Sequence, residues 1–345
     1  MKKARVCVVG MGIGRPNGQA ISRNKRGEVA ALCDIDEDRM KDFSKELPNE
    51  PKLYTDYKKM CKDKEIDAVF VGTPNQLHVP IALEAVKNGK HVLVTKPLSD
   101  SEEAARKLVE VAEAEGVVNM MSLSTRFEDD VQYLGGMAQG GELGEVYYGR
   151  ARSVRRSGIP TWSLGFIKAG GGAFRDMGVH VLDAAWWMMG MPQPSSVSGV
   201  AGAKFGPKGT GYTRFRKVPR KYYSQYDSDD YGGGFIRFEN GAGLQVESFW
   251  ASHHPEEFQI DLFGTDAGAQ LKPITVYRTV KGVPQDVKIE IPKGPEAWDN
   301  IAGHFIDCIL DGGECRAPLR HGLIVQQMLE GLLQSGETGE EVRFG

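Results

Sequence analysis

The chain contains few cysteines and no apolar run long enough to cross a membrane. Five of its 345 residues are cysteines, and no two of them form a C-x-x-C pair. This scatter argues against a disulfide or zinc framework and indicates buried or free thiols in a reducing compartment. The apolar run after the N-terminal basic residues is too short for a signal peptide, and no segment approaches the ~18 apolar residues of a membrane span. We therefore predict a cytoplasmic protein without a membrane partner.

A large excess of charge is also absent. The formal net charge is -3, and 41% of the residues are hydrophobic and 26% charged, which is an ordinary globular composition. This balance gives no general affinity for polyanions, so we expect no nucleic-acid partner. The length is sufficient for about two domains.

Short apolar runs alternate with helix-like polar segments over the N-terminal third of the chain. Each run has the length and composition of a strand buried on both faces of a parallel sheet. The runs are Arg5–Val9, Val29–Cys33, Asp67–Val71, His91–Val94 and Val117–Met121. Strand–helix alternation of this kind predicts an α/β domain with a mostly parallel sheet, which we assign to residues 1–124.

A different pattern begins near residue 125. From residue 195 onward, strand-like runs are separated by turn signals, and Asn240-Gly241 between two of them is a strong hairpin signal. We therefore predict a second, α+β domain with an antiparallel sheet over residues 125–345. It ends in two helices, Glu296–Leu310 and Leu319–Gln334, for which packing back on the first domain is an open alternative.

Glycines follow the first predicted strand, in the segment GMGIG at residues 10–14. Gly10 and Gly12 allow a tight turn and a close approach of backbone N–H groups to a pyrophosphate, whose charge the next helix N-terminus favours. Gly14 comes one position earlier than the third glycine of G-x-G-x-x-G, and Arg15 takes the usual place. The strand–turn–helix order still predicts a dinucleotide-binding site.

An acidic residue ends the second predicted strand, about 20 residues after the glycines, as the dinucleotide fingerprint requires. Asp34 can accept hydrogen bonds from ribose hydroxyls, and its charge repels a 2′-phosphate. Ile35 beside it offers no compensating base. We therefore predict NAD as the cofactor, with NADP less suited to the site.

Polar residues also follow the third and fourth predicted strands. Thr73-Pro74-Asn75 lies where the carboxyl ends of parallel strands open onto a ligand crevice. Lys96 stands just before a proline, which holds it extended at the same edge. His78 either lines this crevice or serves as a structural residue at a helix start. Lys96, taken alone, is either a functional residue or a solvated surface lysine.

The segment GGGAFRDMGVHVLD at residues 170–183 is the main candidate for a chemical role. If it is helical, the spacing of Asp176, His180 and Asp183 places them on one stripe, at ~3.6 residues per turn. Because their neighbours are apolar, these groups either satisfy one another in the core or face a cleft. We expect Asp183 to be structural. The residue types alone would also suit a metal, but no further ligands accompany them, and we predict no metal site.

The segment Lys204–Asp230 is rich in glycine, tyrosine and basic residues. One interpretation is a solvated basic loop. The other is a lid or a subunit-contact loop over an acidic or polyhydroxylated ligand.

Taken together, these motifs resemble the Gfo/Idh/MocA family of oxidoreductases, which includes glucose–fructose oxidoreductase and inositol dehydrogenase. The resemblance covers essentially the whole chain, although each motif alone is unspecific. Its carriers are VVGMGIG, Asp34, TPNQLHVPIALEAVKNGKHVLVTKP, Arg126-Phe127, GELGEV at 141–146, GGGAFRDMGVHVLDAAWWMMG, FENGAG and the closing pair of helices. One departure is Thr95 before Lys96-Pro97, where the family usually has glutamate.

The resemblance implies a Rossmann domain and a second domain with an open, predominantly antiparallel sheet. It also implies a nicotinamide cofactor and a sugar, polyol or inositol-like substrate. Its catalytic lysine before proline and its D-x-G-x-H pair fall on Lys96, Asp176 and His180. For hydride transfer, His180 would be the general acid/base, Asp176 would bind a neighbouring hydroxyl or orient the imidazole, and Lys96 would stabilise the reacting oxygen. We expect Arg126 and Trp162 to bind or stack on the substrate.

The leading prediction is thus an NAD(P)-dependent dehydrogenase acting on CH–OH groups. The alternatives are a glycoside lyase or hydrolase that uses tightly bound NAD to form a transient keto-sugar, and a non-catalytic sugar-sensing regulator. The exposed sheet face in such proteins commonly makes subunit contacts, so the resemblance implies a homodimer or homotetramer. The residues expected at the cofactor are Gly10, Gly12, Ile13, Gly14, Asp34, Ile35, Thr73, Pro74, Asn75, His78, Thr95 and Lys96.

Overall fold

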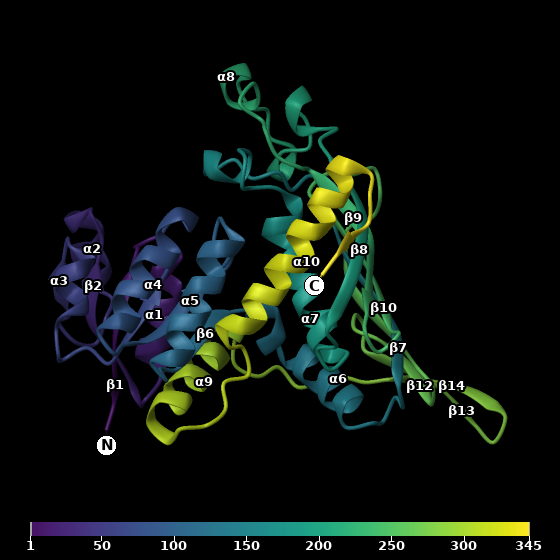
Figure 1. The fold of residues 1–345 in the computed structure, drawn as a ribbon, viewed down its shortest axis with the longest axis horizontal. Coiled ribbons are helices and arrows are strands. Elements are labelled where there is room, and N and C mark those ends of the chain that lie inside the picture. Colours follow the sequence, from purple (N-terminus) through teal and green to yellow (C-terminus); the bar gives the residue numbers. More distant parts are fainter. Residues whose placement is uncertain (1, 345) are drawn as a thin grey trace. The chain divides into compact units, whose positions relative to one another are not determined.

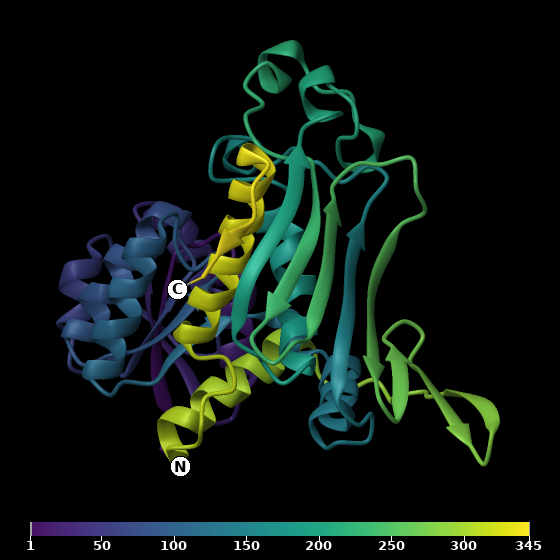
Figure 2. The same cartoon turned by 45° about the vertical axis from the view of Figure 1, so that its right-hand side comes forward.

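The computed structural model describes residues 2–344 and contains two compact units. The first consists of the residues up to 127 together with residues 294–324. The second consists of residues 128–293 together with those from 325 onward. Figure 1 and Figure 2 show both units in two orientations. A late segment of the chain therefore belongs to the unit that contains the N-terminal strands.

The first unit is built on a six-stranded sheet in which every pairing is parallel. In the strand order β3-β2-β1-β4-β5-β6, successive strands are added on one side of β1 up to β3 and on its other side from β4 onward. The carboxyl ends of the two strands at such a switch point, here β1 and β4, are where parallel α/β sheets typically bind ligands. This is the predicted Rossmann arrangement. The strands are β1 (Ala4–Val9), β2 (Gly27–Cys33), β3 (Lys52–Tyr54), β4 (Ala68–Val71), β5 (His91–Thr95) and β6 (Asn119–Ser122).

Helices connect these strands and are stabilised at their ends by local contacts. Asp36 accepts N–H bonds from Asp38 and Arg39 at the start of α2, and Ser101 does the same for Ala104 at the start of α5. No helix within residues 2–344 combines the length and the apolar character needed to cross a bilayer. The helices of this unit are α1 (Gly14–Arg23), α2 (Glu37–Ser44), α3 (Tyr57–Cys61), α4 (His78–Lys87), α5 (Glu102–Ala114) and α9 (Ala297–Asp311).

The second unit is built on a nine-stranded sheet of order β14-β13-β12-β11-β7-β10-β9-β8-β15. Within this sheet, the β7–β10 pair is the only parallel one among the described strands, so the sheet is predominantly antiparallel, as predicted. The Asn240-Gly241 hairpin joins β9 and β10 as expected, with Gly241 at φ 87°. The strands are β7 (Val146–Val154), β8 (Pro194–Gly202), β9 (Tyr231–Phe238), β10 (Gly243–Phe249), β11 (Glu257–Gly264), β12 (Ala267–Gln270), β13 (Thr275–Val280), β14 (Val283–Lys288) and β15 (Val342–Arg343).

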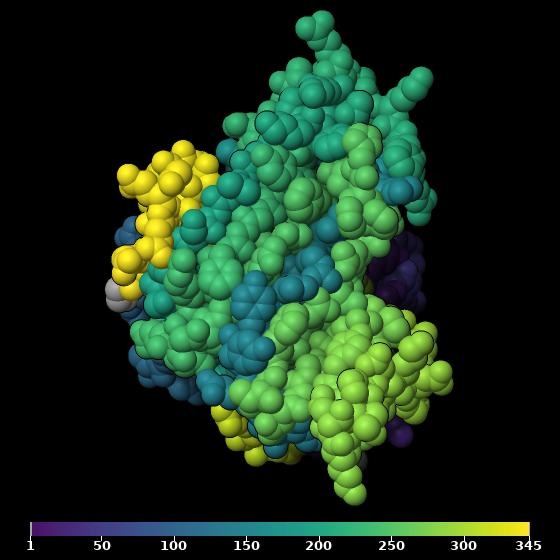
Figure 3. Space-filling model, turned by 90° about the vertical axis from the view of Figure 1, so that its right-hand side faces the viewer, coloured from purple at the N-terminus to yellow at the C-terminus, as the bar shows by residue number. Residues whose placement is uncertain are grey.

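One face of this sheet packs against helix α7 (Val179–Met188), while the opposite face carries aromatic and charged side chains. Tyr148 of β7 lies with its ring centroid 5.9 Å from that of Phe235 and 5.7 Å from that of Phe263, on the two flanking sides. Arg150 places its guanidinium 5.0 Å from the Phe263 ring. Figure 3 shows this face, with the blue atoms of β7 at the surface between the green atoms of its neighbours. The remaining helices here are α6 (Asp129–Gln139), α8 (Arg220–Tyr223) and α10 (Leu319–Thr338), whose first residues belong to the other unit.

Part of the segment 204–230 packs into a small core that it shares with residues outside the segment. Tyr212 is fully buried in a cluster with Ile159 and Trp250. The buried carboxylate of Asp230 accepts the backbone N–H groups of residues 204, 205 and 206 at 2.7–3.0 Å. The basic side chains of the segment are exposed, as the first interpretation expects, while tyrosines between them pack inward; its role as a lid or a subunit contact stays a prediction.

Candidate functional site

The glycine turn after β1 uses its first two glycines for different reasons. Gly10 has φ 89°, and a Cβ there would lie 2.6 Å from the carbonyl oxygen of Gly72 at the end of β4. Gly12 is exposed, and a Cβ there would meet nothing within 4 Å. Gly10 therefore lets two strand ends approach each other, while Gly12 keeps backbone open to a ligand.

The third glycine of the turn explains the irregular spacing. Gly14 begins α1, and a Cβ there would lie 2.8 Å from Cγ1 of Val8. It thus provides the close helix–strand packing that the last glycine of the fingerprint normally provides. Arg15 points elsewhere: it forms ion pairs with Asp42 at 3.1 Å and with Glu46.

Asp34 links the end of β2 to the glycine turn. Its carboxylate accepts the N–H of Met11 at 2.7 Å and that of Asp36 at 3.0 Å. Ile35 is 94% exposed and Ile13 is 38% exposed beside this turn. A cavity of about 430 Å³ adjoins it, lined by Met11, Arg15, Asp36, Asp38, Arg39 and Asp42.

A buried histidine ties together the loops after β4 and β5. His78 starts α4 and is completely buried, with Nε2 2.7 Å from the carbonyl oxygen of Thr73 and Nδ1 2.7 Å from that of Pro97. Burial lowers the pKa of His78, and the two carbonyl contacts only partly oppose this effect. The contacts favour the structural interpretation of His78. Lys96, between Thr95 and Pro97, is half-buried and makes contacts of its own.

One buried hydroxyl at this edge lacks a partner. The Oγ1 atom of Thr73 is buried and has no hydrogen-bond partner among the described residues, which is unusual for such an atom. Pro74 and Asn75 follow it at the strand end, and Asn75 begins the short helix η1 (Asn75–Leu77). An unsatisfied hydroxyl, an open Gly12 and an acceptor at Asp34 together fit a dinucleotide lying across the ends of β1, β2 and β4.

In the second unit, the segment that carries Asp176 is not a regular α-helix. Residues 174–178 form a π-helical turn, η4 (Phe174–Gly178), which leads into α7. The segment is helical, as the predicted stripe requires, but the π turn changes the rotation between Asp176 and the residues that follow it. Such turns are frequent at functional sites.

Asp176 is held by a tryptophan from the sheet. The indole N–H of the fully buried Trp250 donates to Oδ2 of Asp176 at 3.0 Å. Ring centroids lie 6.5 Å apart between Trp250 and Phe166, and 5.6 Å apart between Phe166 and Trp162. Trp162 is 65% exposed, so an aromatic series runs from solvent to the carboxylate. Two predicted residues, Trp162 and Asp176, are thus connected within one unit.

His180 and Asp183 differ in their surroundings. His180 is half-buried, one turn after Asp176, whereas Asp183 is only 1% exposed. Both make contacts with neighbouring groups. The burial of Asp183 supports the structural role that we expected for it.

Asp229, which no sequence motif indicated, holds the start of the segment that carries Asp176 and His180. Its carboxylate accepts the N–H of Phe174 at 2.9 Å, and a Cβ on Gly172 would lie 1.8 Å from its Oδ1. Burial raises the pKa of Asp229 to about 6, although the Phe174 N–H and Arg175 act in the opposite direction. The glycine-rich loop therefore needs Gly172 because an acidic side chain occupies the space beside it. The only sequence signal was the Asp229-Asp230 pair before β9.

Arg126 lies in the first unit and is completely buried. Its Nη1 donates to the carbonyl oxygen of Arg316 at 2.7 Å and to Nδ1 of His321 at 3.0 Å. Burial, followed by the charge of Arg126, lowers the pKa of His321 to about 4. These contacts indicate that Arg126 holds the segment around residue 316, and substrate binding by Arg126 stays a prediction. So does the meeting of Lys96 with Asp176 and His180, which belong to different units.

Comparison with known proteins agrees with these features. Residues 4–123 match the family model "Oxidoreductase family, NAD-binding Rossmann fold", and residues 131–270 match the "GFO/IDH/MocA C-terminal domain". The chain belongs to the Gfo/Idh/MocA oxidoreductase family.

Several characterised members of the Gfo/Idh/MocA family are similar over most of the chain. D-glucoside 3-dehydrogenase of Escherichia coli (strain K12) is 31% identical over 323 residues, covering 92% of this chain and 90% of that protein. The NAD(+)-dependent scyllo-inositol 2-dehydrogenase of Bacillus subtilis (strain 168) is 26% identical, covering 90% and 87%. The structure of levoglucosan dehydrogenase in complex with NADH and levoglucosan has the same fold, with a TM-score of 0.85, 21% identity and 99% coverage of both chains.

Membership in the Gfo/Idh/MocA family confirms the predicted fold, the enzyme class and the nicotinamide cofactor. The protein is an oxidoreductase with an NAD-binding Rossmann domain. The family model covers the glycine turn, Asp34, Thr73 and Lys96, and its C-terminal counterpart covers Asp176 and His180.

Proposed function

We propose that the protein oxidises a secondary ring hydroxyl of a glucoside- or inositol-like polyol, with NAD as the hydride acceptor. The observation that carries this proposal is the hydrogen bond from Trp250 to Asp176, one turn before His180, at the end of an aromatic series that reaches solvent. The similarity to D-glucoside 3-dehydrogenase over nine-tenths of both chains supports a sugar as the substrate.

The three residues of the proposed catalytic set have distinct roles. His180 accepts the hydroxyl proton, because an imidazole titrates near working pH. Lys96 donates a hydrogen bond to the reacting oxygen and stabilises its developing negative charge. Asp176, held by Trp250, accepts a hydrogen bond from the neighbouring hydroxyl and so fixes which carbon reacts. A bound nicotinamide supplies the hydride-accepting carbon.

The aromatic series provides a binding surface for a sugar ring. Trp162 offers an exposed ring face, and Phe166 and Trp250 continue the apolar wall toward the carboxylate. A sugar has an apolar face of C–H groups and an edge of hydroxyls, so it can lie on the ring while its hydroxyls reach Asp176.

The uncovered face of the nine-stranded sheet supports an assembly of identical chains. Tyr148, Phe235 and Phe263 present neighbouring rings on this face, and the ion pairs of Arg152 with Glu257 and Asp261 flank them. An aromatic centre with a charged rim is typical of a subunit interface. We therefore propose a homodimer or homotetramer through this face, in the cytoplasm.

The test is a panel of glucosides, inositols and sugar acids with NAD and NADP, in which reduction of the nicotinamide is followed by absorbance. Net production of NADH over many turnovers is expected with at least one glucoside or inositol. Turnover of a glycoside without net NADH would instead identify a lyase or hydrolase, and binding without turnover would identify a regulator.

Variants assign the roles. His180→Asn and Lys96→Met should each lower kcat/KM about 10²-fold or more, as removal of an acid/base or oxyanion-stabilising group does. The controls His254→Asn and Lys87→Met replace exposed residues and should leave kcat/KM unchanged. Near-normal turnover in both active-site variants would contradict the assignment.

A further inference from the structure

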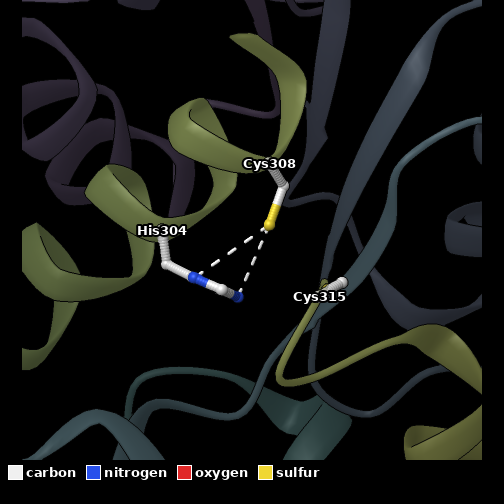
Figure 4. A group of neighbouring side chains, drawn as sticks. All are labelled: His304, Cys308 and Cys315. Carbon is white, nitrogen blue, oxygen red and sulfur yellow. Dashed lines mark hydrogen bonds between the residues drawn. The ribbon is translucent and has the colours of Figure 1, made fainter. Parts of the chain in front are cut away.

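Two cysteines and a histidine that are separated in the sequence come together at the end of α9. His304 and Cys308 lie one turn apart on this helix, and Cys315 follows the helix end at Gly312. The imidazole nitrogens and the two sulfurs offer one atom per residue within 4.8 Å of one another. Figure 4 shows the His304 ring beside the Cys308 sulfur, with Cys315 on the neighbouring segment.

Each member of this cluster has hydrogen-bond partners of its own. The thiol of Cys308 lies 3.7 Å from the carbonyl oxygen of Glu314. Nε2 of His304 lies 3.6 Å from Sγ of Cys308 and also accepts the backbone N–H of Arg316 at 2.9 Å. Because this N–H uses the Nε2 lone pair, the ring proton is on Nδ1, 4.0 Å from the same sulfur. The thiol of Cys315 lies 3.7 Å from the carbonyl oxygen of Asn119.

The residues around the two sulfurs favour a thiolate over a bound metal ion. The charge of Arg316 acts to lower the pKa of Cys308, whereas Cys308 and burial raise the pKa of Cys315 despite the charge of Arg126. A metal would also have to displace the Arg316 N–H from Nε2 of His304. The cluster therefore suits thiol chemistry better than metal binding.

Cys308 differs from the three cysteines of the Rossmann sheet region. Hydrogen bonding with Cys315 lowers the pKa of Cys308; burial opposes this effect, and His304 and Arg316 add to it. Burial instead raises the pKa of Cys7, Cys33 and Cys61. A thiolate is the nucleophilic form of cysteine, so Cys308, which is 3% exposed beside the half-buried Cys315, is the nucleophilic member of the pair.

We propose that Cys308 and Cys315 are a peroxide-reactive thiol pair that closes to a reversible disulfide. The Cys308 thiolate attacks one oxygen of a hydroperoxide, the O–O bond breaks, and a sulfenic acid and an alkoxide or hydroxide form. Cys315 then attacks the Cys308 sulfur, the S–O bond breaks, and the hydroxyl leaves as water with the Cys315 proton. The two sulfurs are oxidised by two electrons and the peroxide is reduced; an external dithiol reverses the reaction.

The connecting loop permits this closure. Gly312 ends α9 with φ 73°, and Gly313 follows it in an exposed stretch. A short glycine-containing loop can bring the sulfurs from contact to bonding distance. The bridge would fix the position of Arg316, whose carbonyl oxygen and backbone N–H hold Arg126 and His304.

The experiment treats the reduced full-length protein with one equivalent of hydrogen peroxide, quenches with a thiol-alkylating reagent and maps the peptides by mass spectrometry. The expected product is a peptide pair linked through Cys308 and Cys315, about 2 Da lighter than the reduced pair and released by dithiothreitol. The cysteines Cys7, Cys33 and Cys61 serve as internal controls and should remain alkylatable after unfolding.

Variants separate the two steps. In Cys315→Ser, a dione probe should trap a sulfenic acid on Cys308, and no linked peptide should form. In Cys308→Ser, neither product should appear. If a variant does not fold, the wild-type peptide map still decides. Retention of both thiols, a different linked pair, or one equivalent of co-purified zinc that protects both thiols from peroxide would overturn the proposal.

Discussion

The glycine turn allows stability and cofactor binding to be perturbed separately. Gly12 and Gly10 are two positions apart, but an added methyl group meets open space at Gly12 and the carbonyl oxygen of Gly72 at Gly10. In Gly12→Ala, the methyl group would occupy the space through which a pyrophosphate approaches the backbone. We therefore expect this variant to fold normally and to bind NAD weakly.

The magnitudes follow from the contacts. Loss of one charge-assisted hydrogen bond to a phosphate costs about 1.5–3 kcal/mol, so the Kd of NAD should rise about 10- to 100-fold in Gly12→Ala. The free energy of unfolding should change by less than about 0.5 kcal/mol. In Gly10→Ala, the positive φ together with a 2.6 Å approach to Gly72 should lower the free energy of unfolding by about 3 kcal/mol.

The assays are urea unfolding followed by circular dichroism and calorimetric titration with NAD at fixed ionic strength. Gly136→Ala is a matched control, because a methyl group there also meets nothing within 4 Å but lies on α6, in the other unit. It should bind NAD normally. Unchanged NAD affinity in Gly12→Ala would refute the assignment of the cofactor to this turn.

Three further changes test other parts of the structure. Trp250→Phe keeps an aromatic ring but removes the N–H donor to Asp176, so kcat/KM should fall about 5- to 50-fold. The control Trp186→Phe removes a buried indole donor to a backbone carbonyl and should not reduce kcat/KM comparably. Burial raises the pKa of Asp229 from 3.8 to about 6, so the folded protein favours the protonated carboxyl. The contribution of this proton to the free energy of unfolding is complete below about pH 4 and is lost as the pH rises through about 6. Asp229→Asn should therefore unfold in urea like the wild type at pH 4 but be more stable by up to about 3 kcal/mol at pH 7; an equal difference at both pH values would contradict the buried charge. The double variant Tyr148→Glu and Phe235→Glu should sediment as a smaller species than the wild type. The control Val283→Glu, at an exposed position on a distant hairpin, should not. An unchanged sedimentation coefficient of the double variant would show that this sheet face is not the interface.

The Rossmann unit could be predicted from the sequence because its signals are local. Buried parallel strands form continuous apolar runs, and each was recognised close to its observed bounds except for β3, which has only three residues and two exposed side chains. The early Gly14 also weakened the fingerprint, because the sequence does not show that Val8 lies against the start of α1.

The features that the sequence did not reveal depend on partners far along the chain. The π turn at residues 174–178 starts where Asp229 accepts the Phe174 N–H, 55 residues away. The tyrosines of segment 204–230 form a core only because Ile159 and Trp250 lie beside them. By contrast, Cys308 and Cys315 are close in the sequence, and their meeting depends on the turn of the chain where α9 ends at Gly312. None of these contacts produces a residue spacing that could be recognised in the sequence.

His78 has a consequence for attempts to redesign the cofactor edge. Its two ring nitrogens lie 2.7 Å from the carbonyl oxygens of Thr73 and Pro97, so this single side chain connects the two loops. A loop grafted onto residues 95–97, for example one with glutamate at position 95, keeps its shape only while the His78 ring stays in this position. Anyone who transplants the lysine loop from another enzyme should therefore move the histidine with it.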